Sequence, residues 1–495
     1  MITIVGGGLA GSEAAWQAAS QGVPVTLHEM RPVRPTAVHK TDRLAELVCS
    51  NSLRGDKLDN AVGLLKEEMR RLESLIMRAA EASRVPAGAA LAVDRERFSE
   101  AITHALTTHP LVTIVRDEVV AIPSATERDP VIVATGPLTS EALSADIARL
   151  VGAEHLYFYD AISPIVLAES IDRDKVFRAS RWNRSIRLKP DPAYRLSAAD
   201  PANTGPACGV DDGEGDYLNC PLTREEYERF YDALIHAESA TVHDFDKEKF
   251  FEGCLPIEVM AHRGADTLRF GPMKPVGLTD PRTGRPPYAA VQLRQDNLAG
   301  DHYSLVGFQT QLKWSEQARV LRLIPGLEAA EFARFGLVHR NTYVNGPDVL
   351  METWQVRRRP ALFFAGQMSG VEGYVESAAS GLLAGLNAAR MAGGEPLSSP
   401  PRTTAIGALA YYVSHANPAH YDPSNITFGI MESLANAPRG KVAKKLAISE
   451  RALSDLERWR DGLKAVPYTA SDVVPHTAPD VAPDVGHGLQ TVPNR

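Results

Sequence analysis

The sequence predicts an α/β protein in which one parallel sheet is assembled from two distant segments and a smaller α+β domain is inserted between them. The chain opens with an apolar strand, a glycine-rich turn and an alanine-rich helix at residues 2–21, and a second strand follows at 23–28. This order of elements is typical of a parallel sheet. Two later apolar runs that end in glycine, at 131–136 and 362–366, are expected to join the same sheet.

The middle of the chain differs in composition. It is rich in proline, glycine and short alternating runs, and it holds one clear helix, whose start is marked by Thr223 and Glu226 as a capping box. A further amphipathic helix is expected at 59–83, with Asp59 as its cap. We therefore expect a sheet domain whose first part is 1–186, an inserted domain at 187–305, the second part of the sheet domain at 306–440, and a helical extension with a disordered tail at 441–495.

Residues 6–11 (GGGLAG) have the G-x-G-x-x-G spacing between the first strand and its helix, and Glu29 follows the second strand. This context predicts a Rossmann-like dinucleotide site in which Gly6 makes the turn, Gly8 lets the backbone approach the pyrophosphate, and Gly11 lets helix and strand pack closely. Glu29 is expected to accept hydrogen bonds from ribose hydroxyls. A glycine-rich turn without a ligand is the alternative. The expected lining of this turn also includes Gly7, Leu9 and Ala10.

The late segment 363–370 (FFAGQMSG) indicates FAD as the dinucleotide, because it resembles the second segment of two-segment FAD-binding proteins. In that fold a late strand ends in Ala-Gly-Asp beside the ribityl chain. Here Gln367 replaces the aspartate, which removes a charge and keeps a hydrogen-bonding group. We expect the remaining cofactor contacts to come from Gly136, Tyr343, Gly366, Gln367, Gly373 and Tyr374. The alternative for the two tyrosines is a place in the core, where aromatic residues are more often found.

Composition limits the other possibilities. The 495 residues have a formal net charge of -8, so any RNA-binding surface must be local. The four cysteines, Cys49, Cys208, Cys220 and Cys254, show no C-x-x-C spacing, so neither a zinc knuckle nor another metal site is expected. No apolar run approaches the about 18 residues of a membrane span. A cytoplasmic protein with free thiols is expected.

Three segments carry a closer resemblance: 47–54 (LVCSNSLR), 217–222 (YLNCPL) and 370–377 (GVEGYVES). Over about residues 1 to 440 the chain resembles the folate- and FAD-dependent tRNA (uracil-5-)-methyltransferases, which are related to the GidA proteins. The longer GidA-type proteins, which modify the wobble uridine, are the second possibility. A flavin oxidoreductase acting on a small molecule and a non-catalytic flavin-bearing RNA-binding protein are the rival classes.

The resemblance implies transfer of one carbon from 5,10-methylenetetrahydrofolate to C5 of the T-loop uridine at tRNA position 54, with reduced FAD as reductant and NADPH or NADH as its electron source. It also implies functional cysteines at Cys49 and Cys220. We expect the Cys220 thiolate to add to C6 of uracil, because Cys220 lies close to a helix start that favours thiolate. Cys49, in a polar loop, is then expected to act as the general base. The reverse assignment, the folate pocket and the oligomeric state stay open.

A basic segment is the candidate RNA-binding surface. It combines arginine and lysine with Trp182 and Tyr194, a composition suited to phosphates and unstacked bases. A solvated charged face is the alternative, and Cys208 and Cys254 are expected to be inert. The basic residues expected to contact the T-arm of tRNA are Arg178, Arg181, Arg184, Arg187 and Lys189, and the run 357–359 is a second candidate.

Overall fold

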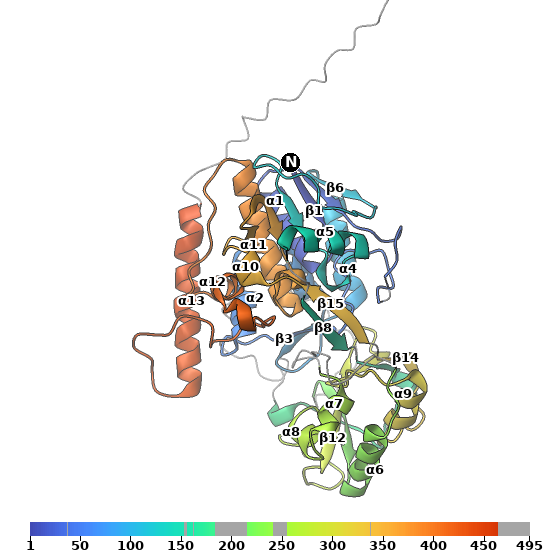
Figure 1. Cartoon of the computed structure of the whole chain (residues 1–495). Coiled ribbons are helices and arrows are strands. Elements are labelled where there is room, and N and C mark those ends of the chain that lie inside the picture. Colours follow the sequence, from blue (N-terminus) through green and yellow to red (C-terminus); the bar gives the residue numbers. More distant parts are fainter. Residues whose placement is uncertain are drawn as a thin grey trace, which may run out of the picture.

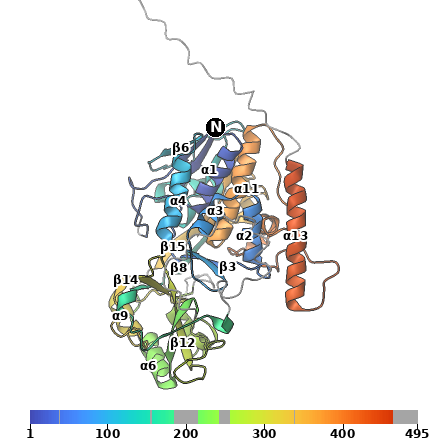
Figure 2. The same cartoon turned by 180° about the vertical axis from the view of Figure 1, so that it is seen from behind.

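The computed structural model describes residues 1–36, 38–152, 156–161, 163–183, 215–240, 255–336 and 338–463. Figure 1 shows a larger part, which contains the N-terminus, and a smaller part below it. The same division is seen from behind in Figure 2. No helix among the described residues is long and apolar enough to span a membrane.

The larger part is built on a six-stranded sheet with the order β16-β17-β7-β1-β2-β6. All neighbouring strands in it are parallel except β16 and β17. Because β17 pairs with β7, segments more than 200 residues apart share one sheet, as the sequence predicts. The strands are β1 (Ile2–Val5), β2 (Val25–His28), β6 (Val112–Val115), β7 (Val131–Val133), β16 (Gln355–Val356) and β17 (Arg359–Phe364).

Helices α1 (Leu9–Ser20) and α11 (Tyr374–Ala392) pack side by side in this part (Figure 1). A Cβ atom on Gly381 would overlap the carbonyl oxygen of Ala10, so the close approach of the two backbones requires glycine at this point. The two helices that begin at the sheet's carboxyl edge are thereby fixed against each other. Further helices of this part, besides α2 and α3 described below, are α4 (Arg95–Thr107), α5 (Glu141–Val151), α10 (Gly346–Val349) and α12 (Ala405–His415).

The helix expected at 59–83 is two helices, α2 (Ala61–Arg71) and α3 (Leu75–Ala82). The chain turns at Glu73, which has a φ of 57°. Ser74 then caps α3 by accepting a hydrogen bond from the backbone N–H of Met77. The cap of α2 is Asn60 and not the expected Asp59. Ser74, which lies within the apolar periodicity of the sequence, therefore marks the start of a second helix and not the interior of a single one.

The smaller part contains a second six-stranded sheet, with the order β10-β11-β12-β13-β9-β14 and antiparallel pairing throughout. Its strands span residues 165 to 334, a wider interval than the expected 187–305. Three of them have only three residues, too few to show alternation in the sequence. We propose that the inserted domain includes this wider interval. The strands are β9 (Ile165–Leu167), β10 (Phe177–Ala179), β11 (Tyr217–Leu222), β12 (Ala289–Gln295), β13 (His302–Leu305) and β14 (Phe332–Arg334).

Helix α6 (Arg224–Ile235) lies against one face of this second sheet. The expected capping box is confirmed: the Glu226 N–H donates to Thr223 Oγ1 at 3.2 Å, and the Thr223 N–H donates to Glu226 Oε2 at 2.8 Å. Phe230 and Leu234 of α6 are buried in the second hydrophobic core. The shorter helices of the smaller part are α7 (Ile257–His262), α8 (Thr267–Phe270) and α9 (Trp314–Leu321).

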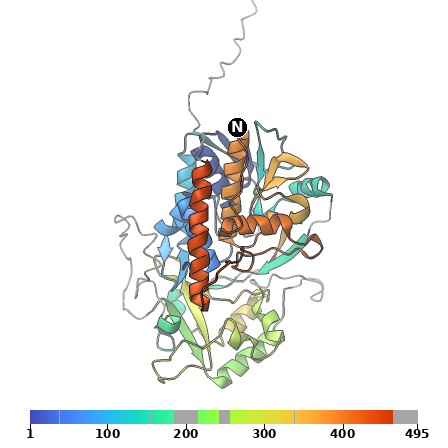
Figure 3. The same cartoon turned by 90° about the vertical axis from the view of Figure 1, so that its left-hand side faces the viewer.

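Two small sheets and a long helix complete the described chain. The ribbon β8 (Leu156–Ala161) with β15 (Val338–Tyr343) runs between the two parts (Figure 1). A three-stranded sheet is formed by β3 (Ser52–Gly55), β5 (Ala90–Val93) and β4 (Arg84–Val85). Helix α13 (Lys441–Leu463) stands along the side of the larger part (Figure 3), and the tail expected to be disordered, from 464 on, lies outside the described residues.

Candidate cofactor cleft and catalytic residues

A cleft with an empty volume of about 1130 Å³, partly open to solvent, lies at the carboxyl ends of the parallel strands. Residues from both distant segments line it, which is the arrangement expected for a dinucleotide at such a sheet edge. The sequence-predicted residues that line the cleft are Gly6, Gly7, Gly8, Leu9, Ala10, Glu29, Cys49, Gly136, Gly366, Gln367 and Tyr374.

The glycine-rich turn has different requirements at each position. A Cβ atom on Gly11 would overlap the carbonyl oxygen of Gly6, so Gly11 serves the packing of helix on strand and does not line the cleft. A Cβ atom on Gly8 would meet no protein atom within 4 Å. Gly8 is also the N-cap of α1, with no side chain capping that helix. The first N–H groups of α1 are thus available to an anion, so the residues present fit a pyrophosphate.

Glu29 is buried at the edge of the cleft and is 5% exposed. Its carboxylate accepts hydrogen bonds from the N–H of Gly7 at 3.1 Å and from the Nε of Arg31 at 2.8 Å. Burial alone would raise the pKa of Glu29, but the hydrogen bonds and charge of Arg31 outweigh it and hold this pKa below its usual value. Glu29 is therefore an ionised acceptor that also fixes the glycine turn, while its contact with ribose hydroxyls stays a prediction.

Sequence reasoning missed part of the lining. Arg31 and His39 line the cleft, and so do two groups of residues that directly follow parallel strands. The carboxyl ends of parallel strands meet at one edge of a sheet. Recognition of the strand at 112–115 in the sequence would therefore have indicated the residues after it as part of the cleft lining. The missed groups are Asp117, Glu118 and Val119 after β6, and Thr135, Pro137, Leu138, Thr139 and Ser140 after β7.

Cys49 is half-buried and lines the cleft. Its backbone N–H donates a 2.7 Å hydrogen bond to the hydroxyl oxygen of Tyr374, the first residue of α11. The carbonyl oxygen of Cys49 accepts hydrogen bonds from Arg95 at 2.7 Å and from Arg334 at 2.8 Å. The structure thus brings the predicted Cys49 and Tyr374 together beside the glycine turn.

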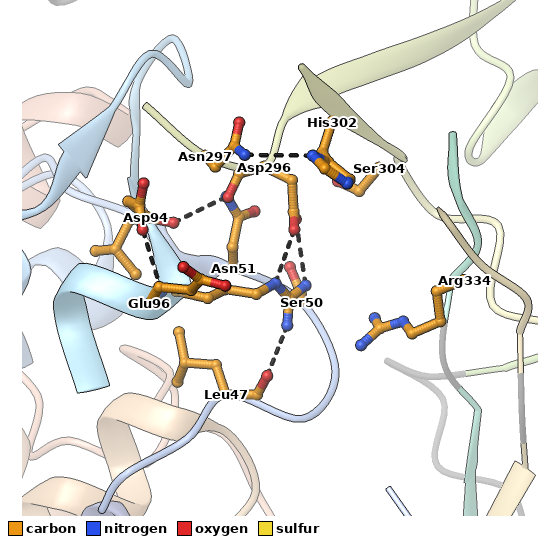
Figure 4. A network of polar contacts seen from close by, with 12 residues as sticks. Leu47, Ser50, Asn51, Asp94, Glu96, Asp296, Asn297, His302, Ser304 and Arg334 are labelled. Carbon is orange, nitrogen blue, oxygen red and sulfur yellow. Dashed lines mark hydrogen bonds and ion pairs between the residues drawn. The ribbon is translucent and has the colours of Figure 1, made fainter. Parts of the chain in front are cut away.

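The arginines around Cys49 belong to a polar network that joins the two parts of the molecule (Figure 4). Asp296, which directly follows β12, forms a two-pronged ion pair with Arg95, with N–O distances of 2.9 and 3.2 Å. Burial alone would raise the pKa of Asp296, but the charge and hydrogen bonds of Arg95, together with the charges of Arg294 and Arg334, outweigh burial and hold this pKa below its usual value. Asn51 donates from its side chain to the carbonyl oxygen of Asp296 at 3.2 Å. Sequence reasoning missed this network, because the residues that it joins across the two parts lie more than 200 positions apart.

Cys220 lies elsewhere. It is on β11 with 0% exposure, and together with Leu218 and Leu222 it belongs to the core under α6. Burial raises the pKa of its thiol, which is the opposite of the thiolate that the nearby helix start was expected to favour. In the conformation described burial disfavours the thiolate, so the role of Cys220 as the nucleophile stays a prediction. Cys220 does not line the cleft.

Two other predicted cofactor residues also lie outside the cleft lining. Tyr343 is 2% exposed and packs against Tyr421, with ring centroids 6.3 Å apart. It is therefore a core residue, which was the alternative to a cofactor contact. Burial raises the pKa of Tyr343 to about 12. Gly373 precedes α11 with a φ of 106°, a conformation that favours glycine.

The predicted basic surface is described only in part. Arg178 donates to the hydroxyl of Tyr303 at 3.3 Å. Arg181 donates to the Gln292 side chain at 2.9 Å and to backbone carbonyls of the turn that holds Gly277, and Trp182 beside it is 53% exposed. Arg184, Arg187, Lys189, Cys208 and Cys254 lie outside the described residues. No group of three or more acidic, histidine or cysteine residues in the described ranges could hold a metal ion.

Known proteins with this architecture identify the family. The family model of glucose inhibited division protein A, GIDA, matches residues 1–191 and 202–396. Two solved structures of Aquifex aeolicus GidA share the fold, with TM-scores of 0.66 and 0.67, identities of 18% and 19%, and coverage of 92% and 93% of this chain and 73% and 75% of theirs.

The sequence comparison is closer. The chain is 57% identical to the methylenetetrahydrofolate--tRNA-(uracil-5-)-methyltransferase TrmFO of Desulforudis audaxviator, over 92% of this chain and 98% of the relative. It is 57% identical to the protein of the same name from Symbiobacterium thermophilum, over 94% and 98%, and 55% identical to that of Enterococcus faecalis, over 91% and 97%. The chain therefore belongs to the GidA family and, within it, to the methylenetetrahydrofolate--tRNA-(uracil-5-)-methyltransferases.

Proposed function

We propose that the chain methylates C5 of a uracil in tRNA, with 5,10-methylenetetrahydrofolate as the carbon donor. The observation that carries this proposal is its identity of 57% with a relative of that name over nearly the full length of both chains. Following the resemblance, the target is the T-loop uridine at tRNA position 54, and the product is 5-methyluridine. Because the substrate is tRNA, we place the enzyme in the cytoplasm.

FAD fits the cleft best, because its lining comes from the two segments typical of FAD-binding proteins. The open space at Gly8 and the N–H groups at the start of α1 would receive the pyrophosphate. Gly366, Gln367 and Tyr374, which line the same cleft, would contact the rest of the cofactor. When bound and reduced, FAD supplies the reducing equivalents of the reaction, and NADPH or NADH is the proposed source of its electrons.

The two cysteines would act in sequence. The thiolate of Cys220 would add to C6 of uracil, which makes C5 nucleophilic enough to form the bond to the incoming carbon. Cys49, at the cleft, would then take the proton from C5 while the bond between the transferred carbon and the donor nitrogen breaks, with the electron pair leaving on that nitrogen. The two reducing equivalents named above would convert the resulting methylene group to methyl, and the bond between C6 and sulfur would break to release the Cys220 thiolate. Because Cys220 has 0% exposure, its thiol must become accessible before it reacts, so the proposal requires a local rearrangement around β11 on RNA binding.

The T-arm is proposed to approach the side of the smaller part that carries Trp182, Arg178 and Arg181. An exposed tryptophan suits an unstacked base, and the arginines suit phosphates. The same segment continues into Arg184, Arg187 and Lys189.

The test uses purified enzyme, a T-arm transcript, NADPH and labelled carbon donors. Label from methylenetetrahydrofolate is expected in 5-methyluridine at position 54, and label from S-adenosylmethionine is not. Mass spectrometry of digested transcript locates the product. Label from S-adenosylmethionine would overturn the proposed donor, and product at the wobble uridine of full-length tRNA would favour the GidA-type activity.

A further inference from the structure

The loop that carries Cys49 has an unusual source of hydrogen bonds. Residues 47–51 form neither helix nor strand, so their polar groups need partners from elsewhere. Each of these five consecutive residues offers an oxygen atom to at least one of three guanidinium groups, and the carbonyl oxygen of Cys49 bonds to two of them. The bonds are those of Leu47 O and Cys49 O with Arg95, of Val48 O and Cys49 O with Arg334, and of Ser50 Oγ and Asn51 Oδ1 with Arg294.

Two of the three arginines come from the smaller part. Arg294 is the second-last residue of β12 and is 8% exposed, and its bonds to Ser50 and Asn51 measure 2.7 and 2.9 Å. Arg334 ends β14, and its bonds to Val48 and Cys49 measure 3.3 and 2.8 Å. Figure 4 shows Arg334 on the side of the loop opposite Asp94. The position of Cys49 in the cleft of the larger part is therefore set largely by the second sheet.

The charges around the loop are unbalanced. Three guanidinium groups bond to it, whereas Asp296 is the carboxylate paired with them among the described residues. Asp94, also nearby, caps α4 and accepts the Leu298 N–H, and Glu96 lies in the first turn of that helix. The Cys49 thiol interacts electrostatically with all three guanidinium groups. Positive charge beside a cysteine favours the thiolate, which is the form that can accept a proton.

We infer that Arg294 and Arg334 are positioning residues for Cys49, so that docking of the second sheet on the larger part is what places and activates this thiol. The inference rests on the proposed function only for the role of Cys49 in methyl transfer. It predicts that the cysteine loses reactivity when either arginine is removed, even though FAD binds to other residues.

The test measures the rate at which iodoacetamide alkylates each cysteine of the FAD-loaded enzyme, by peptide mass spectrometry. Arg334→Gln and Arg294→Gln are each expected to slow alkylation of Cys49 by about tenfold or more, and to lower kcat for methylation on the order of tenfold to a hundredfold. KM for the transcript is expected to change less. Arg334→Lys keeps the charge and is expected to recover part of both rates.

The matched control is Arg322→Gln. Arg322 lies in the same part of the molecule and also donates to a backbone carbonyl, that of Ala330, at 3.0 and 3.2 Å. This variant is expected to keep the wild-type alkylation rate at Cys49. Cys220 reports on folding, because it reacts only if the second core opens.

Two results would overturn the inference: wild-type alkylation rates at Cys49 in Arg334→Gln and Arg294→Gln with Cys220 still protected, or a wild-type Cys49 that reacts no faster than Cys220. The alkylation measurement needs no RNA. If the chain did not methylate tRNA, the proposed function would fail while the reactivity of Cys49 could still be decided.

Discussion

The backbone N–H of Cys49 donates a 2.7 Å hydrogen bond to the hydroxyl oxygen of Tyr374, which joins residues 325 positions apart in the chain. This bond connects the arginine-held loop to the start of α11. Tyr374→Phe removes only the hydroxyl, so kcat for methylation is expected to fall about threefold to tenfold, since a neutral hydrogen bond is worth about 0.5–1.5 kcal/mol. FAD content should stay close to that of the wild type.

Tyr411→Phe is the control for this prediction, because the Tyr411 ring stacks on His415 in α12 and does not line the cleft. Steady-state kinetics with the T-arm transcript compares the two variants. Equal kcat values in Tyr374→Phe and the wild type would mean that this bond does not help to place Cys49.

Gly8→Leu is expected to abolish FAD retention while the protein stays folded. A side chain at Gly8 meets no protein atom and has an ordinary φ of -73°, so the fold tolerates it, but it would stand where the pyrophosphate must lie. Gly11→Ala should behave differently, with a loss of about 1–3 kcal/mol in the free energy of unfolding, because its Cβ overlaps the Gly6 carbonyl.

Flavin absorbance after purification and denaturant titration separate the two effects. Gly462→Leu, in the remote helix α13, also adds a side chain in open space and should leave both FAD content and stability near the wild type. Full FAD retention in Gly8→Leu would show that the dinucleotide lies elsewhere.

The buried carboxyl group of Glu68 is expected to make the free energy of unfolding depend on pH. It is fully buried in α2, and its carboxylate accepts hydrogen bonds from the N–H groups of Ala405 and Ile406 at the start of α12. Burial raises the pKa of Glu68 from its ordinary 4.5 to about 8, more than these hydrogen bonds lower it. The folded state therefore binds the proton more tightly than the unfolded state, and this contribution to stability is present at low pH and lost as pH rises through about 8.

Glu68→Gln removes this titration. Between pH 5 and pH 9 the wild type should lose stability relative to Glu68→Gln, with the difference read from denaturant titrations at several pH values. Parallel stability curves for the two proteins would show that the carboxyl group is already ionised at low pH.

The parts of the fold that were predictable have strong local signals. The strand, glycine turn and helix at the amino terminus follow one another within twenty residues, and the capping box at Thr223 is complete within four. The three-residue strands at the edges of the second sheet have no such signal, because so short a run shows no period. The break between α2 and α3 depends on Ser74, whose hydroxyl also donates to the buried Glu13 at 2.7 Å, a contact that no local pattern predicts.

The part of the site that the backbone forms, at Gly6, Gly8 and Gly366, could be predicted from the sequence. The part that depends on tertiary contacts could not. Arg294 and Arg334 reach the loop that carries Cys49 from strands more than 240 residues further along the chain, so nothing near Cys49 in sequence indicates them. The burial of Cys220 did have a signal. Alternation along β11 places Leu218, Cys220 and Leu222 on one face, and that face is the core.

The last prediction concerns the order in which the two cysteines act. If Cys220 adds to C6, Cys220→Ala should lose both turnover and the covalent complex with a T-loop RNA that carries 5-fluorouracil, because fluorine at C5 blocks proton loss and traps the adduct. If Cys49 is the base, Cys49→Ala should lose turnover and still form the adduct. Denaturing gel electrophoresis of labelled RNA measures the complex.

The burial of Cys220 sharpens this test. Its thiol has 0% exposure, so iodoacetamide should react with it slowly in the free enzyme and faster when the T-loop RNA is bound. The double variant should be scarcely slower than the worse single variant, as expected for residues that act in one sequence of steps. An adduct that survives in Cys220→Ala and vanishes in Cys49→Ala would reverse the two roles. That outcome would also mean that β11 need not rearrange, because Cys49 already lines the cleft.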